Sequence, residues 1–232
     1  MTYVTTTRTL LAIDTATSAV TAAVLVGSGL VANVSLPESR RHAETLAPTI
    51  DAAMAQAGLV PADLDAVAVG VGPGPFTGLR VGIVTATTLG LALGIPVYAV
   101  CSLDAVAHQV ATLGGTAEYT EFLVATDARR KEVYWARYVM VDEVVERQGE
   151  PAVCLPANLD SALRALPAAG RGPLLYPEHF SVSIEVTDVD AGALASLVVH
   201  RLEHGGELLA PNPLYLRHPD AKPSVAVKSV LT

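Results

Sequence analysis

The chain has 232 residues, of which 51% are hydrophobic and 16% are charged, and its formal net charge is −8. This composition excludes an intrinsically disordered chain, because disorder requires low hydrophobicity and many charges. It also excludes a protein that holds nucleic acid through a positive net field. With so few charged residues, a monomer would expose part of its apolar surface to water. We therefore expect an interface with a partner.

The first 113 residues alternate between strand and helix patterns. Short apolar runs predict strands at 9–13, 20–26, 30–36, 65–71 and 96–100. Apolar residues at helical spacing predict a helix over 42–57, which must begin late or kink at Pro48. Further helices are expected from the Gly72–Gly78 loop to Gly94 and over 102–112, where Ser102 is a suitable N-cap. The order βββαβαβα predicts a mixed sheet with helices on its faces.

The second half begins like the first. Leu11–Asp14 recurs as Val124–Asp127 at an offset of 113 residues, and strands are expected at 121–127, 132–140 and 142–148. We therefore expect an α/β fold of duplicated βββαβα halves, as in the actin, hexokinase and Hsp70 ATPases (the ASKHA class). Weaker patterns predict helices at 156–166 and 190–203 and a short strand at Leu174–Leu175.

These patterns suggest a division of the chain into two lobes and a tail. The predicted N-terminal lobe spans 1–113, and the degenerate C-terminal lobe spans 114–217. Residues 218–232 contain two prolines and two lysines without a clear period, so a loosely ordered tail is expected there.

The location expected from the sequence is the cytoplasm. The first residues lack the apolar core of a signal peptide, and the two cysteines lie outside any CxxC spacing, which favours reduced thiols. The 23 residues between Arg80 and Asp104 carry no charge, but the break at Gly94–Pro96 predicts a buried helix followed by a strand rather than a membrane span.

Asp14 and Asp127 are weak candidates for binding a nucleotide, since each ends the first strand of its half. Neither is followed by the glycine that lets a phosphate approach the backbone. The loop Gly72–Gly78 also fails the P-loop test: it has no lysine, and its two prolines remove N–H donors. A rigid structural connection is the favoured interpretation of this loop.

Small residues recur every four positions on the helix that follows the loop. They form one stripe with almost no side chain, made of Gly78, Gly82, Ala86 and Gly90. Two interpretations remain open: close packing on the chain's own sheet, or packing against a partner helix. Together with the apolar face of the preceding helix (Leu46, Ile50, Met54), the stripe is our predicted partner interface.

The histidines, the cysteines and the basic run form no recognisable catalytic or metal-binding motif. His200 and His204 lie four residues apart but lack the glutamate of an HExxH frame, so a solvated helix face is favoured over a metal site. Neither cysteine has a catalytic companion. The basic run Arg129–Lys131 lies next to Tyr134 and Trp135, and RNA contact is its functional interpretation, with a solvated turn as the default.

At this point the motifs resemble the TsaB (YeaZ) family over most of the chain. The block Val69–Arg80, which contains GPGPFTGLR, is the most specific of them. The others are Leu11–Thr15, His42–Leu46, Ile95–Val97, Cys101–Leu103, Asp127–Tyr134 and Leu214–Arg217.

The resemblance implies a dimerisation subunit of the bacterial complex that attaches threonylcarbamoyl to the adenosine beside the tRNA anticodon. It implies the ASKHA fold, no catalysis or cofactor, a TsaD-type catalytic paralogue and a TsaE-type ATPase as partners, and self-dimers when the chain is alone. It further implies that this chain contacts tRNA only indirectly, through the complex. TsaD-like chains carry a metal-binding HxxxH that corresponds here to the frame Ser102–Val106, where serine and valine replace both imidazoles.

Three hypotheses follow for the function. The first is a non-catalytic scaffold of the tRNA threonylcarbamoyl-transfer machinery. The second is a nucleotide-binding ATPase of the ASKHA class that uses Asp14 and Asp127. The third is an RNA-binding module that acts alone through Arg129–Lys131.

Overall fold

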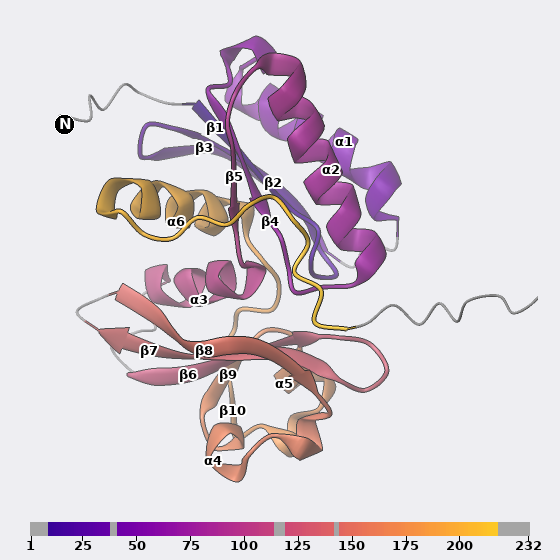
Figure 1. Ribbon diagram of the computed structural model, residues 1–232, viewed down its shortest axis with the longest axis vertical. Helices are drawn as coiled ribbons and strands as arrows, with labels where there is room; N and C mark the ends of the chain where they lie inside the picture. Colours follow the sequence, from indigo (N-terminus) through magenta and orange to yellow (C-terminus); the bar gives the residue numbers. More distant parts are fainter. Residues whose placement is uncertain (1–8, 38–40, 114–118, 142–143, 218–232) are drawn as a thin grey trace, which may run out of the picture.

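The computed structural model describes residues 9–37, 41–113, 119–141 and 144–217. Within these residues the chain forms two five-stranded mixed sheets of the same topology (Figure 1). The first sheet has the order β3-β2-β1-β4-β5, and the second has the equivalent order β8-β7-β6-β9-β10. The matching orders confirm the predicted duplication and the ASKHA-type α/β fold.

The first sheet is the better formed of the two. Its strands are β1 (Thr9–Asp14), β2 (Val20–Val26), β3 (Gly29–Leu36), β4 (Ala66–Gly70) and β5 (Val97–Val100). β1 runs antiparallel to β2 and parallel to β4. Leu11 and Ile13 face the core on one side of this sheet, and Leu10 and Ala12 face the core on the other. Burial on both faces explains why the strand is a continuous apolar run.

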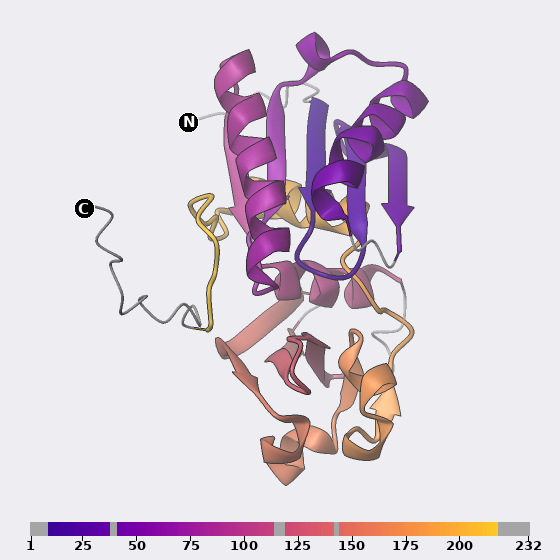
Figure 2. The same cartoon turned by 90° about the vertical axis from the view of Figure 1, so that its right-hand side faces the viewer.

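Two helices cover the outer face of the first sheet (Figure 2). α1 (His42–Ala57) and α2 (Phe76–Leu93) both end at a left-handed glycine. α1 runs through Pro48 from His42, so a late start, the first of the two predicted alternatives, is wrong, and the kink stays a prediction. Among the described residues, α2 is the one helix with the length and apolar composition of a membrane span. Its inner face lies in the core, as predicted for a buried helix.

The second sheet has shorter elements on its far side. Its strands are β6 (Glu121–Asp127), β7 (Val133–Val141), β8 (Val144–Cys154), β9 (Pro167–Ala169) and β10 (Val182–Ser183). The helix expected over 156–166 is only a 3-10 turn, Pro156–Asn158, and one turn of helix, α4 (Ser161–Arg164). Leu174–Leu175 lies in α5 (Gly172–Leu175), so the predicted strand is wrong. Pro173 sets a helical φ at the start of α5.

Two helices form a layer between the sheets (Figure 1). α3 (Ser102–Thr112) packs on the second sheet, and α6 (Ala191–His204) packs on the first. After α6 the chain stays with the first sheet, where the N–H of Leu209 donates to the carbonyl of Ala99 on β5. The predicted C-terminal lobe 114–217 therefore needs correction, because its last part belongs to the first sheet. The predicted tail 218–232 lies outside the described residues.

Candidate functional site at the junction of the two lobes

The carboxyl ends of β1, β4 and β5 meet at one edge of the first sheet, where Asp14 is the central residue. Its carboxylate is fully buried and accepts a hydrogen bond from Ser102 Oγ at 2.7 Å and another from the N–H of Ala16 at 2.7 Å. Burial is the main cause that raises the pKa of Asp14 from 3.8 to about 6, and these two hydrogen bonds partly oppose it. Asp14 is thus a buried and fully engaged group.

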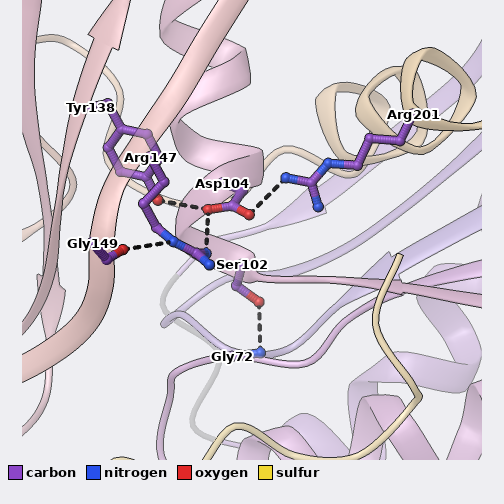
Figure 3. Close-up of polar contacts among 7 residues, drawn as sticks. All are labelled: Gly72, Ser102, Asp104, Tyr138, Arg147, Gly149 and Arg201. Atoms are coloured by element: carbon purple, nitrogen blue, oxygen red, sulfur yellow. Dashed lines mark hydrogen bonds and ion pairs between the residues drawn. The ribbon is translucent and has the colours of Figure 1, made fainter. Parts of the chain in front are cut away.

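Ser102 has a different role from the predicted N-cap. The N-cap of α3 is Cys101, and Ser102 is the first helical residue. Besides donating to Asp14, Ser102 Oγ accepts the N–H of Gly72 at 3.0 Å (Figure 3). The side chain therefore joins β1 and the glycine-rich loop to the start of α3, a contact that local sequence preference does not reveal.

The glycine-rich loop packs against the turn after β1. A Cβ on Gly70 would lie 1.8 Å from Asp14 Oδ2, so no side chain is possible there while the carboxylate keeps its place. Cβ atoms on Gly74 and Gly78 would each lie 2.5 Å from a backbone oxygen of the same turn. The loop is a tight structural connection, which is the interpretation favoured from the sequence.

The small-residue stripe of α2 also faces inward. Its four members are buried: Gly78, Gly82, Ala86 and Gly90. Thr15 Oγ1 donates to the carbonyl of Gly78 at 2.8 Å and accepts the N–H of Gly82 at 3.1 Å. A Cβ on Gly90 would lie 2.4 Å from Val97 on β5. Close packing within the chain accounts for the stripe.

The predicted interface on α1 needs a similar correction. Leu46 and Met54 are buried in the core of the first sheet, and Ile50 is partly buried against the same core. Leu46, Met54 and the stripe therefore face the chain's own core, and Ile50 stays only a predicted interface residue. The sequence identified the apolar faces of both helices but not which face points outward.

The two sequence-predicted nucleotide residues do not share a cleft. Asp127 lines a hollow between the lobes, but Asp14 does not. The hollow has a volume of about 10 Å³, room for about one water molecule. Pockets for small-molecule ligands are typically about 300–1,000 Å³. Asp127 is also engaged, since it accepts the N–H of Arg129 at 2.7 Å and pairs with the Arg129 guanidinium at 3.1 Å. A nucleotide would require the lobes to part.

The frame that corresponds to a metal-binding HxxxH carries no ligands at its ends. The Ser102 hydroxyl is hydrogen-bonded to Asp14, and Val106 is fully buried in the core between the sheets. Across the described part of the chain, no group of three His, Cys, Asp or Glu side chains is placed to hold a metal ion. His200 and His204 stack on α6 with ring centroids 4.3 Å apart. Both cysteines are free, and burial raises the pKa of Cys101 to about 12, which keeps its thiol protonated.

Asp104, in the middle of that frame, joins four elements (Figure 3). One carboxylate oxygen accepts the hydroxyl of Tyr138 at 2.9 Å and a guanidinium nitrogen of Arg147 at 2.8 Å. The other oxygen accepts Arg201 on α6 at 2.8 Å. This network ties α3 to β7, β8 and α6. Its partners are not evident from the sequence, although an aspartate in an otherwise uncharged stretch is a signal.

The basic run Arg129–Lys131 forms the turn between β6 and β7. All three residues have positive φ values, of 62°, 54° and 64°, and all are exposed. Beside this turn lies a further feature missed from the sequence, a stack of Phe76 on Tyr215 with ring centroids 5.1 Å apart.

Comparisons with known proteins give a consistent result. A family model described as "TsaD: tRNA N6-adenosine threonylcarbamoyltransferase" matches residues 29–183, more than half of the chain. An uncharacterized protein of Mycobacterium tuberculosis is 48% identical, over 93% of this chain and 94% of that protein. A Haemophilus influenzae protein named "tRNA threonylcarbamoyladenosine biosynthesis protein TsaB" is 31% identical, over 90% and 94%. The solved YeaZ of Pseudomonas aeruginosa is 32% identical, with a TM-score of 0.75 and coverage of 90% and 100%.

The duplicated sheets, each opening with a strand that ends in aspartate, define a protein of the ASKHA class. Within that class, the chain belongs to the TsaB (YeaZ) family.

Proposed function

We propose that this chain is a non-catalytic subunit of the machinery for tRNA threonylcarbamoyladenosine biosynthesis. In this proposal it acts in the cytoplasm, binds a TsaD-type catalytic paralogue and a TsaE-type ATPase, and forms self-dimers when alone. The names of the TsaB relatives and the family model support the process and the type of partner.

The observation that carries the proposal is the outer face of α2, defined by Val84, Thr88, Leu91 and Ala92. Val84 is 56% exposed and Leu91 is 86% exposed. No charged residue occurs from Val81 to Leu93. A helix on the surface of a monomer normally carries polar and charged residues on its outer face. This face is therefore suited to burial against an apolar partner, and it takes the place of the inward-facing stripe as the proposed interface.

The lack of catalysis is inferred from the residues at the lobe junction. Ser102 and Asp104 are committed to hydrogen bonds and ion pairs within the chain, and Val106 is in the core. Asp14 is enclosed beneath Gly70 and Ser102. Since these groups are engaged with one another, we assign the chemistry to the partner and the assembly to this chain.

The test is binding to the TsaD-type paralogue from the same organism. Leu91→Glu would bury an unpaired carboxylate in the interface, and we expect it to weaken the complex by about 30-fold or more, measured by calorimetry. Leu113→Glu is the matched control, because Leu113 is also an exposed leucine (67%) but lies at the end of α3. Both variants should melt like the wild type.

The cellular readout is the modified adenosine in tRNA, measured by mass spectrometry in cells depleted of the native subunit. Leu91→Glu should fail to restore it, and Leu113→Glu should restore it. The scaffold proposal is wrong if the wild-type chain does not bind the paralogue, or if both variants bind it equally well.

A further inference from the structure

An aromatic and basic patch lies where the C-terminal segment meets the start of α2 and the β6–β7 turn. Its members are Phe76, Arg80, Arg129, Arg130, Lys131, Tyr215 and Arg217. Phe76 is 50% exposed and Tyr215 is 42% exposed, and their rings stack with an interplanar angle of 25°. The guanidinium of Arg80 lies over the Phe76 ring at 5.1 Å from its centroid. Because Phe76 already contacts both Tyr215 and Arg80, the exposed surface of Tyr215 is the part of the pair on which a further ring can stack.

Direct contacts join the aromatic and basic parts of the patch. Arg217, two residues after Tyr215, donates to the carbonyl of Arg129 at 3.5 Å and pairs with Glu132. Tyr134 at the other end of the turn donates to the carbonyl of Gly74, two residues before Phe76, at 3.4 Å. These contacts place the β6–β7 turn next to the segments that carry Phe76 and Tyr215.

The charge of the patch is opposite to that of the whole chain. It gathers five cations, of which Arg129 pairs with Asp127 and Arg217 pairs with Glu132. The turn Arg129–Lys131 consists of three consecutive residues with left-handed backbone conformation, and all three residues are exposed. In a chain of net charge −8, a local positive surface orients a polyanion, because the rest of the molecule repels it.

We propose that this aromatic and basic patch binds single-stranded RNA, with a base stacked on the Phe76–Tyr215 pair and phosphates held by the β6–β7 turn. Single-stranded nucleic acid is recognised by this combination of a stacking platform and a cationic track. The proposal goes beyond the proposed function, because it gives this subunit its own RNA contact, where the family resemblance implies only an indirect one. It does not depend on the outer face of α2.

The test uses the full chain and two probes, a labelled single-stranded RNA 12-mer of mixed sequence and the matching RNA duplex. Fluorescence anisotropy should show tighter binding to the single strand. The logarithm of the association constant should fall with the logarithm of salt concentration with a slope of about −2 to −3.5, as expected for three to five neutralised phosphates.

Two pairs of variants separate the parts of the patch. Tyr215→Ala should weaken single-strand binding by about 5- to 150-fold, the usual loss for one stacked base, while Tyr215→Phe should keep it. Lys131→Gln should weaken binding and reduce the salt slope by about 0.7. Arg137→Gln on β7 removes one cation outside the patch and should leave both unchanged.

Several results would overturn the proposal. The proposal is wrong if the wild-type chain does not bind the 12-mer at low salt or binds the duplex more tightly. It is also wrong if Tyr215→Ala and Lys131→Gln both bind the 12-mer like the wild type. If Arg137→Gln weakens RNA binding as much as Lys131→Gln does, binding depends on the overall charge of the chain and not on the patch, and the proposal is wrong. Tyr215→Ala should still co-elute with the TsaD-type paralogue, so failures of RNA binding and of partner binding are separately visible.

Discussion

Replacing Asp14 with asparagine should make the stability of the protein less dependent on pH between about 4 and 7. Burial raises the pKa of Asp14 from 3.8 to about 6 in the folded chain. The folded state therefore binds a proton more tightly than the unfolded state over this window. By linkage, the contribution of Asp14 to the free energy of unfolding falls as pH rises from about 4 through 6 and is fully unfavourable at pH 7.

The size of the effect follows from the shift. Two pKa units at about 1.4 kcal/mol each correspond to about 3 kcal/mol of stability lost on ionisation of the buried carboxyl. An asparagine has nearly the same shape and carries no charge: its Oδ1 can still accept the Ala16 N–H, and its Nδ2 can donate to Ser102 Oγ, which reverses the direction of that hydrogen bond. Asp14→Asn should therefore gain up to about 3 kcal/mol over the wild type at pH 7 and almost nothing at pH 4.

The assay is urea unfolding of both proteins from pH 4 to pH 7.5, followed by circular dichroism. Asp51→Asn on the exposed face of α1 controls for the loss of one negative charge. The difference between Asp14→Asn and wild type should grow with pH beyond any difference seen for Asp51→Asn. If the difference in unfolding free energy between Asp14→Asn and the wild type does not change with pH, ionisation of the buried Asp14 carboxyl does not destabilise the fold, and the reasoning is refuted.

Two further predictions concern the same junction. Gly70→Ala places a Cβ 1.8 Å from the Asp14 carboxylate and should destabilise the fold by about 3 kcal/mol or more, measured by thermal unfolding. The cost of Gly70→Ala should be smaller in the Asp14→Ala background, and equal costs in both backgrounds would contradict the clash. Asp104→Ala leaves Arg147 and Arg201, both about one fifth exposed, without their carboxylate, and should cost about 2–4 kcal/mol in urea unfolding. A cost below about 1 kcal/mol for Asp104→Ala would mean that the network contributes nothing beyond a surface pair.

Local patterns predicted the first half of the fold well because its elements are long. The apolar run of β1 and the periodic helices over 42–57 and 102–112 were predicted at their observed positions. In the second half, elements of two to four residues such as α5 and β10 have too few residues for a period to emerge, so Leu174–Leu175 was misassigned. Short elements depend on neighbours that are distant in sequence.

The candidate site shows the same division. The glycine-rich loop was recognised as a structural connection because its prolines remove N–H donors, and Ser102 and Val106 were identified as lacking imidazoles. The partners of Asp104 lie 34, 43 and 97 residues away, and Tyr215 stacks on Phe76 although the two residues are far apart in the sequence. No periodicity reports contacts of that kind.

The sequence by itself determined that the chain is a folded, acidic protein with a duplicated strand pattern, a helix of small residues and an uncharged stretch from Val81 to Ile95 and beyond. Only the tertiary structure decided which way that helix faces. Small residues are required where two backbones approach closely, and the pattern is the same whether the second backbone belongs to this chain or to another. The contacts with Thr15 and Val97 assign the stripe to this chain and leave Val84 and Leu91 on the outside.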